Sequence, residues 1–154
     1  MKMVLNYPVS LSVIRKLKAG DVVHYNGKIV VVEKSLIDTI LNYEKSEGIK
    51  LYDLTGEIVV FGFFEKNRLV YQEVDPDSLS TAFVLGVVGV VVEKNPPLED
   101  VIVKFARVVF KPEEELKGKR NLVFKTPDGR KVEELEVTNL ILRVLQDASG
   151  KSLP

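Results

Sequence analysis

Only a few side chains of this 154-residue sequence have the types and spacing that support chemistry. His24 is the sole histidine, so it could carry a proton but could not form a histidine-rich metal site. Asp75 and Asp77 are paired acids, although the proline and serine interleaved with them are typical of a helix cap or turn. Ser149-Gly150-Lys151-Ser152 resembles the end of a phosphate-binding loop, but it lacks the earlier glycine and the following helix. For each of these groups, a packing or turn role is the simpler interpretation.

The composition excludes several classes of protein. There is no cysteine, so this chain cannot contain a disulfide, a cysteine-ligated zinc or an iron–sulfur cluster of its own. Lysine plus arginine balances aspartate plus glutamate at 22 each, which gives no sign of a nucleic-acid or anionic-membrane partner. The longest apolar run, Ala82 to Val92, is far shorter than the ~20 residues of a membrane span. The first ten residues lack the apolar core of a signal peptide, so we expect a cytoplasmic protein.

The elements that would position any site follow from hydrophobic periodicity. The length predicts one domain over residues 1–154. Strand-like apolar runs alternate with short amphipathic helices, and two or three hairpins force antiparallel neighbours. These patterns predict an α/β fold with a mixed sheet. The expected helices are Ser10–Lys18, a segment from Ser35 that Gly48 ends, Leu79–Leu85 and a segment from Pro96 to Lys104.

The first hairpin is predicted around Asn26-Gly27. This pair favours a tight two-residue turn, because both turn positions need positive φ. Apolar runs flank it, so Val22–Tyr25 and Lys28–Val32 are expected to pair with each other. Residues at the centres of the apolar runs should be almost inaccessible to solvent: Ile29, Val31, Ile58, Val60, Val90, Val108 and Leu142. Strands Lys131–Val137 and Leu140–Leu145 are expected to end the fold.

Three stretches carry a resemblance to a known family. "LKAGDVVHYNGKIVVVEK", from Leu17 to Lys34, is similar to "LKAGDVVLLSGTIYTARDAAHKRL" of the β subunit, or C-terminal domain, of class I fumarases and L-tartrate dehydratases. "KVEELEVTNLILRVLQDASGKSL", from Lys131 to Leu153, resembles that family's "EAIWKLEVEDFPAIVVVDDKGNSLF". "PPLEDVIVKFARVVF", from Pro96 to Phe110, is similar to the family's "RSEEVIEAIKKYKAVYF". Over all its matches, the resemblance touches roughly two thirds of the chain and is carried by scaffold residues.

The resemblance implies a single swivelling β/β/α-type domain. It also implies a hydro-lyase subunit with no cofactor in this chain and a four-iron, four-sulfur cluster in a separate, cysteine-bearing α subunit. In that family the active site forms between the two subunits. We therefore expect the isolated chain to be inactive. The sequence leaves a homo-oligomer open.

The catalytic motifs of the family are mostly absent. Where the family has Arg, Asp and His after the first hairpin, this chain has Glu33, Lys34 and Ile37. An anion thus replaces a cation suited to a dicarboxylate. The family's "GPTTSGRMDxYTP" motif is missing. In the segment similar to "GxxGMIGKG", Lys94 is the closest match to the family lysine and is the one candidate catalytic residue, although a solvated Glu93-Lys94 pair after a strand is the alternative.

Two functions follow from these observations. The first is the β subunit of an iron–sulfur-dependent hydro-lyase of the fumarate hydratase or L-tartrate dehydratase type. The second is a catalytically degenerate binding or regulatory module on the same fold, which the residues at positions 33, 34 and 37 favour. A neighbouring gene for a cysteine-bearing α subunit would discriminate between them.

Overall fold

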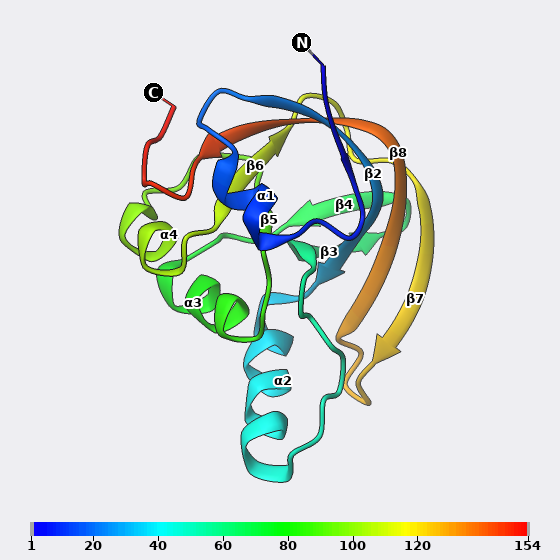
Figure 1. The fold of residues 1–154 in the computed structure, drawn as a ribbon. Helices are drawn as coiled ribbons and strands as arrows, with labels where there is room; N and C mark the ends of the chain where they lie inside the picture. Colours follow the sequence, from blue (N-terminus) through cyan, green and yellow to red (C-terminus); the bar gives the residue numbers. More distant parts are fainter. Residues whose placement is uncertain (1, 154) are drawn as a thin grey trace.

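The computed structural model describes residues 2–153, over which eight strands and four short helices alternate (Figure 1). In chain order these are β1 (Met3–Asn6), α1 (Leu11–Lys16), β2 (Val22–Val32), α2 (Lys34–Glu47), β3 (Ile58–Glu65), β4 (Arg68–Tyr71), α3 (Pro76–Val84), β5 (Gly89–Val91), α4 (Glu99–Phe105), β6 (Val108–Pro112), β7 (Lys119–Lys125) and β8 (Lys131–Gln146). The predicted α/β class is confirmed.

Local sequence signals account for several helix ends. The side chain of Ser10 accepts a hydrogen bond from the N–H of Val13 at the start of α1. At the start of α3, the side chain of Asp75 accepts a hydrogen bond from the N–H of Ser78, and Pro76 occupies the first helical position. Helix α2 ends at Gly48, whose φ of 68° is the left-handed conformation that glycine adopts without strain. Local residue types therefore account for the starts of α1 and α3 and for the end of α2.

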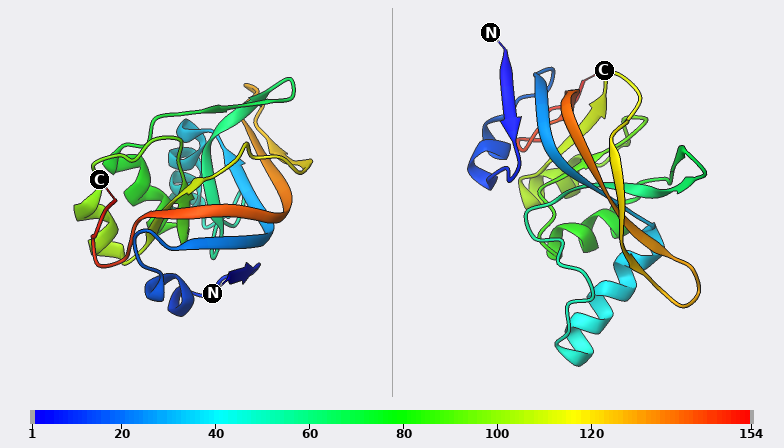
Figure 2. Two further views of the ribbon diagram at one scale, coloured as in Figure 1. Left: turned by 90° about the horizontal axis from the view of Figure 1, so that it is seen from above. Right: turned by 90° about the vertical axis from the view of Figure 1, so that its right-hand side faces the viewer.

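The strands form one mixed sheet in the order β1-β2-β3-β5-β6-β8-β7, with β4 beside β3. Strands β1, β2, β3, β5 and β6 run parallel, whereas β8 is antiparallel to β2, β6 and β7. Because β8 pairs with β2 as well as β6, the strands β2, β3, β5, β6 and β8 close into a ring. Figure 2 shows β8 lying beside β2 along its length. Closure leaves few exposed sheet edges.

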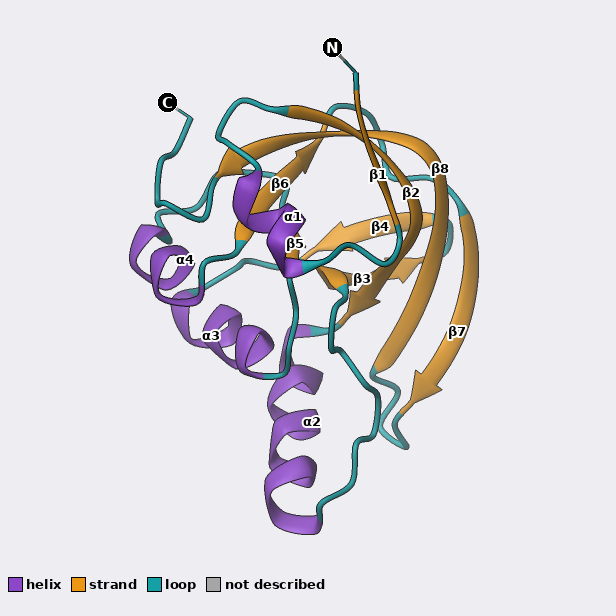
Figure 3. Cartoon of the chain, viewed as in Figure 1, coloured by secondary structure: helices purple, strands orange, loops and turns teal. Residues whose placement is uncertain are grey.

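The apolar side chains separate into two cores because neighbouring residues of a strand point to opposite faces. On β2, Ile29 and Val31 face the inside of the ring, and Val30 and Val32 face the helices. Helices α2, α3 and α4 gather on one side of the sheet (Figure 3). The predicted core is confirmed, since every residue of that prediction is at most 2 % exposed: Ile29, Val31, Ile58, Val60, Val90, Val108 and Leu142.

The predicted hairpin at Asn26-Gly27 is wrong. Strand β2 runs without a turn from Val22 to Val32, and a register shift against β8 falls at Asn26. Gly27 has a φ of 139°, and a Cβ there would lie 2.2 Å from the Cβ of Tyr7. The glycine thus serves a bulge and a close approach of Tyr7 rather than a turn.

The two predicted C-terminal strands are likewise one strand, β8, which runs through the same irregularity at Asn139, where φ is 52°. Hairpins do occur elsewhere. Strands β3 and β4 pair around a turn at Lys66 and Asn67, and β7 and β8 pair around a turn at Pro127-Asp128-Gly129. The mixed sheet with hairpins and short helices is therefore as expected, except that Asn26-Gly27 is not one of its turns.

Candidate functional site

A groove opens where the parallel strands β5 and β6 end. It consists of two adjoining cavities of about 430 and 300 Å³, which share Tyr71 and Glu93. Residues after β4 and β5 line the larger cavity, and the end of β6 with β4 lines the smaller one. We call the two cavities together the carboxyl-edge groove. In open α/β sheets, ligands bind outside the carboxyl ends of the parallel strands. The sheet of this chain is closed, but its parallel strands β5 and β6 end at the same groove.

Lys94 lies in the loop that follows β5 and lines this groove. The loop is held at both ends, because the N–H of Val92 donates to the carbonyl of Phe110 at 2.8 Å and Asn95 bonds the C-terminal segment. Lys94 itself is exposed and forms no ion pair with any other residue in the range 2–153. Its ammonium group is therefore available to an anionic ligand.

Tyr71, at the end of β4, lies where the two cavities meet. Burial, together with the negative charges of Glu93 and Glu115, raises the pKa of Tyr71 to about 12. Like an unperturbed tyrosine, the phenol is protonated at neutral pH and can donate a hydrogen bond to a ligand in the groove. Arg68 and Lys111 add two cations to the smaller cavity. The groove thus brings three cations and a phenol together with three carboxylates, those of Glu73, Glu93 and Glu115.

The residues that stand in place of the family's Arg, Asp and His are engaged in the fold. Glu33 accepts a hydrogen bond from the N–H of Lys131 at 2.7 Å. The ammonium of Lys34 lies 3.2 Å from the carboxylate of Asp75. Ile37 is fully buried against the helix-side core. The backbone N–H of Lys34 donates at 2.7 Å to the side-chain oxygen of Gln72. Because Gln72 lines the groove, Lys34 lies near the groove as well. None of the three is free for chemistry.

The other candidates from the sequence have structural partners. His24 Nδ1 lies 2.8 Å from Oδ1 of Asn139, which belongs to the neighbouring strand β8. Asp75 caps α3, and the hydrogen bond from the N–H of Ser78 lowers the pKa of its carboxyl below the usual value. Asp77 lies in the first turn of that helix. The structure does not bring these residues together.

The sequence analysis missed a polar cluster formed by β2, β8, the residue after β1 and the segment before β3. Glu57 is buried, with the ammonium of Lys28 at 2.8 Å and the hydroxyl of Tyr7 donating to it at 2.8 Å. Lys28 also lies 3.3 Å from Glu134, which accepts from the hydroxyl of Tyr52 at 2.6 Å. No short-range signal could reveal this cluster, because its members are 50 and 106 residues apart in sequence. Of its members, Glu134 borders a small cavity of about 170 Å³ between β7 and β8, whereas the buried Glu57 takes both of its partners from within the cluster.

Metal-binding and membrane-spanning features were also sought in residues 2–153. That range contains no group of three or more histidine, cysteine, aspartate or glutamate side chains able to hold a metal ion. None of its helices is long and apolar enough to cross a bilayer. No protein-family model matches the chain, and no curated protein matches it.

Proposed function

We propose that the chain is the smaller subunit of an iron–sulfur-dependent hydro-lyase of the fumarate hydratase or L-tartrate dehydratase type, active only with a separate α subunit. One observation carries this proposal. Lys94, the residue that the resemblance aligns with the family lysine, lies exposed in the carboxyl-edge groove and, within residues 2–153, has no ion-pair partner. The parallel sheet, its helical layer and the antiparallel β8 also agree with a β/β/α architecture.

The residues of this chain would position a carboxylate substrate. The ammonium of Lys94 would attract a substrate carboxylate into the groove. The protonated phenol of Tyr71 would donate a hydrogen bond to the same ligand. With no cysteine in the sequence and no suitable ligand group in residues 2–153, this chain does not fit an iron–sulfur cluster, which the proposal assigns to the α subunit.

A second function, a binding or regulatory module, is favoured by a different observation. Glu33 and Lys34 are committed to Lys131 and Asp75, and Ile37 is in the core. The positions that would clamp a dicarboxylate and transfer a proton in the family are therefore unavailable here. In this case the groove would bind a small carboxylate without turning it over.

The test is reconstitution with a cysteine-bearing α subunit encoded beside this chain. The two proteins are co-expressed without oxygen and purified together, and hydration of fumarate and dehydration of L-tartrate are measured for the complex and for each protein alone. The proposal predicts turnover only in the complex. Saturable binding of a dicarboxylate to this chain, with no turnover in a complex whose cluster is intact, would instead establish the binding module.

A further inference from the structure

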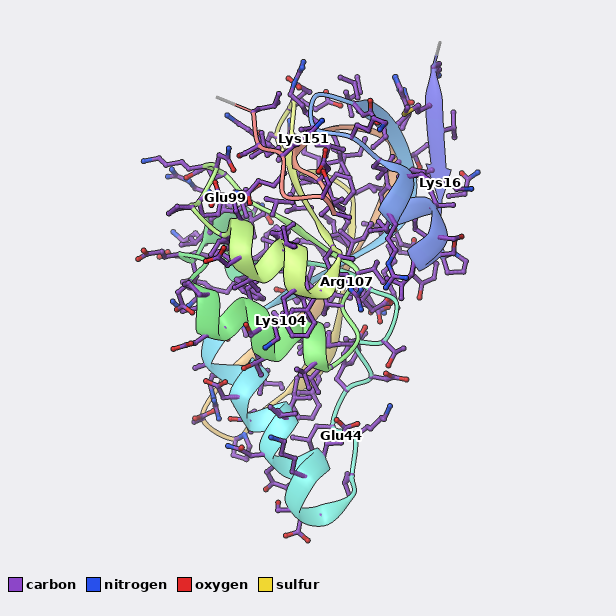
Figure 4. All side chains as sticks on the ribbon, turned by 60° about the vertical axis from the view of Figure 1, so that its left-hand side comes forward. Lys16, Glu44, Glu99, Lys104, Arg107 and Lys151 are labelled. Atoms are coloured by element: carbon purple, nitrogen blue, oxygen red, sulfur yellow. The ribbon has the colours of Figure 1, made fainter. Side chains whose placement is uncertain are left out.

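A second cleft, separate from the groove, lies between α1 and the turn that follows β8. It has a volume of about 420 Å³, and none of its residues lines the carboxyl-edge groove. Four of the side chains around it are cations: Arg15, Lys16, Lys18 and Lys151. We call it the basic cleft. Figure 4 brings forward the side of the molecule on which Lys16 and Lys151 are labelled.

The positive charges of the basic cleft are not neutralised by ion pairs. Across residues 2–153, no carboxylate lies within ion-pair distance of any of these four side chains. Arg107 adds a further cation nearby, and its pKa is lowered by burial and by the charge of Arg15. The sequence as a whole is balanced at 22 cations and 22 anions, so this clustering is a local excess. Such a concave cationic surface concentrates anions.

Two carboxylates, Asp147 in the lining of the cleft and Asp21 beside it, hold the backbone in place. Asp147 accepts hydrogen bonds from the N–H groups of Ala19, Ser149 and Lys151 at 3.0, 3.0 and 3.1 Å. Asp21 accepts from the N–H of Lys18 at 2.8 Å. These bonds fix the wall of the cleft and leave the four cationic side chains exposed to solvent. The cations around the cleft therefore outnumber these carboxylates by four to two.

We propose that the basic cleft binds a small anion that carries two or more phosphate groups. Its volume lies within the ~300–1,000 Å³ of small-molecule sites and is too small for a folded partner. Several cations around one concavity match a ligand with several negative charges, and the arginine can bind phosphate oxygens through two N–H groups.

The turn Ser149-Gly150-Lys151-Ser152 takes part through its side chains. In a phosphate-binding loop the backbone N–H groups cradle the ligand. Here the N–H groups of Ser149 and Lys151 are already donated to Asp147. Recognition therefore rests on the ammonium of Lys151 and on the cations of α1 and the loop after it.

The experiment is calorimetric titration of the full chain with inorganic pyrophosphate at low salt. We expect saturable binding to one site, weakened as salt is added. A double variant, Lys16→Gln with Lys151→Gln, should bind at least about tenfold more weakly. Lys45→Gln, which removes one exposed charge from α2, is the matched control and should bind as the parent does. Single Lys18→Gln serves if the double variant loses its native circular dichroism.

Two further arms identify the ligand class and the place of binding. Citrate should bind more weakly than pyrophosphate, and a single-stranded oligonucleotide should show no tighter binding. Amide chemical shifts should change at Ala19 and Ser149 and stay constant in the groove. Absence of saturable pyrophosphate binding, equal binding by the lysine variants and the parent, or tighter binding of citrate or the oligonucleotide would each overturn the proposal. These outcomes do not bear on Lys94, whose site shares no residue with the basic cleft.

Discussion

We predict that the partly exposed ammonium of Lys28 contributes strongly to the free energy of unfolding. It lies between two carboxylates, 2.8 Å from Glu57 and 3.3 Å from Glu134. The side chain of Glu57 is only 3 % exposed, whereas that of Lys28 is 23 % exposed. Burial alone would lower the pKa of Lys28, but the hydrogen bond and the charge of Glu57 more than offset it and raise the pKa above its ordinary value. Lys28→Met removes the charge and keeps most of the aliphatic stem.

The magnitude follows from what the substitution leaves behind. Glu57 would keep the hydrogen bond from Tyr7 but lose its only ion-pair partner in residues 2–153, and it would face Glu134 with no cation between them. Removing one partner of a fully buried pair costs about 3–5 kcal/mol, whereas an exposed pair contributes about 0–1 kcal/mol. Because Lys28 is partly exposed, we expect a loss of about 2–3 kcal/mol in the free energy of unfolding.

The assay is urea unfolding near neutral pH, followed by circular dichroism. Lys117→Met is the matched control, because Lys117 pairs with Glu115 at 3.7 Å with both side chains at least 70 % exposed. It should change the free energy of unfolding by less than about 0.5 kcal/mol. The double variant Lys28→Met with Glu57→Gln should lose less than the sum of the two single changes, by about 1 kcal/mol or more.

A loss for Lys28→Met no larger than that for Lys117→Met would refute this reasoning. So would strict additivity in the double variant, because it would mean that the charges of Lys28 and Glu57 contribute independently. Either result would mean that the pair of Lys28 and Glu57 contributes no more to stability than an exposed ion pair does.

Three more results are expected. Gly27→Ala should lower the free energy of unfolding by about 2–4 kcal/mol, because the new Cβ would clash with Tyr7. Gly129→Ala is the control in the same urea assay and should cost about 1 kcal/mol, because Gly129 also has positive φ but has open space around it. Equal costs for the two variants would mean that the contact with Tyr7 is unimportant. Asp147→Asn should cost about 1–3 kcal/mol and speed hydrogen exchange at Ala19, and unchanged exchange would argue against the bond. In the folded chain, the pKa values of four tyrosines are raised: Tyr7, Tyr25, Tyr52 and Tyr71. The melting temperature should therefore stay constant up to about pH 10, the pKa of tyrosine in the unfolded chain, and should fall above it. A melting temperature that stays constant to higher pH would contradict the raised pKa values.

Much of the fold could be predicted because burial has a short-range signature. The apolar runs at Ile58 and Val87 are strands, and Gly48 and Asp75 end and begin helices as their residue types indicate. The turn at Asn26-Gly27 could not be predicted correctly. Positive φ suits a bulge as well as a turn, and the choice depends on Tyr7 and on β8, which lie elsewhere in the sequence. Closure of the sheet has no local signal for the same reason.

The candidate site was only partly accessible from the sequence. Lys94 came from a resemblance, and its catalytic role stays a prediction. Tyr71 reaches the groove because β4 folds back on β3, and its pKa depends on Glu93 and Glu115 from other segments. The basic cleft depends on the contact between Ala19 and Asp147, 128 residues apart. Such groups become neighbours only through tertiary structure.

The central claim is tested most directly by Lys94→Ala in the complex with the cysteine-bearing α subunit. The account predicts that kcat for fumarate hydration falls by at least about 100-fold. The iron–sulfur content and the melting temperature of the Lys94→Ala complex should stay at the parent values. A control complex with Lys45→Ala should keep the parent activity. A Lys94→Ala complex with the parent kcat would contradict the account and remove the catalytic role of the carboxyl-edge groove.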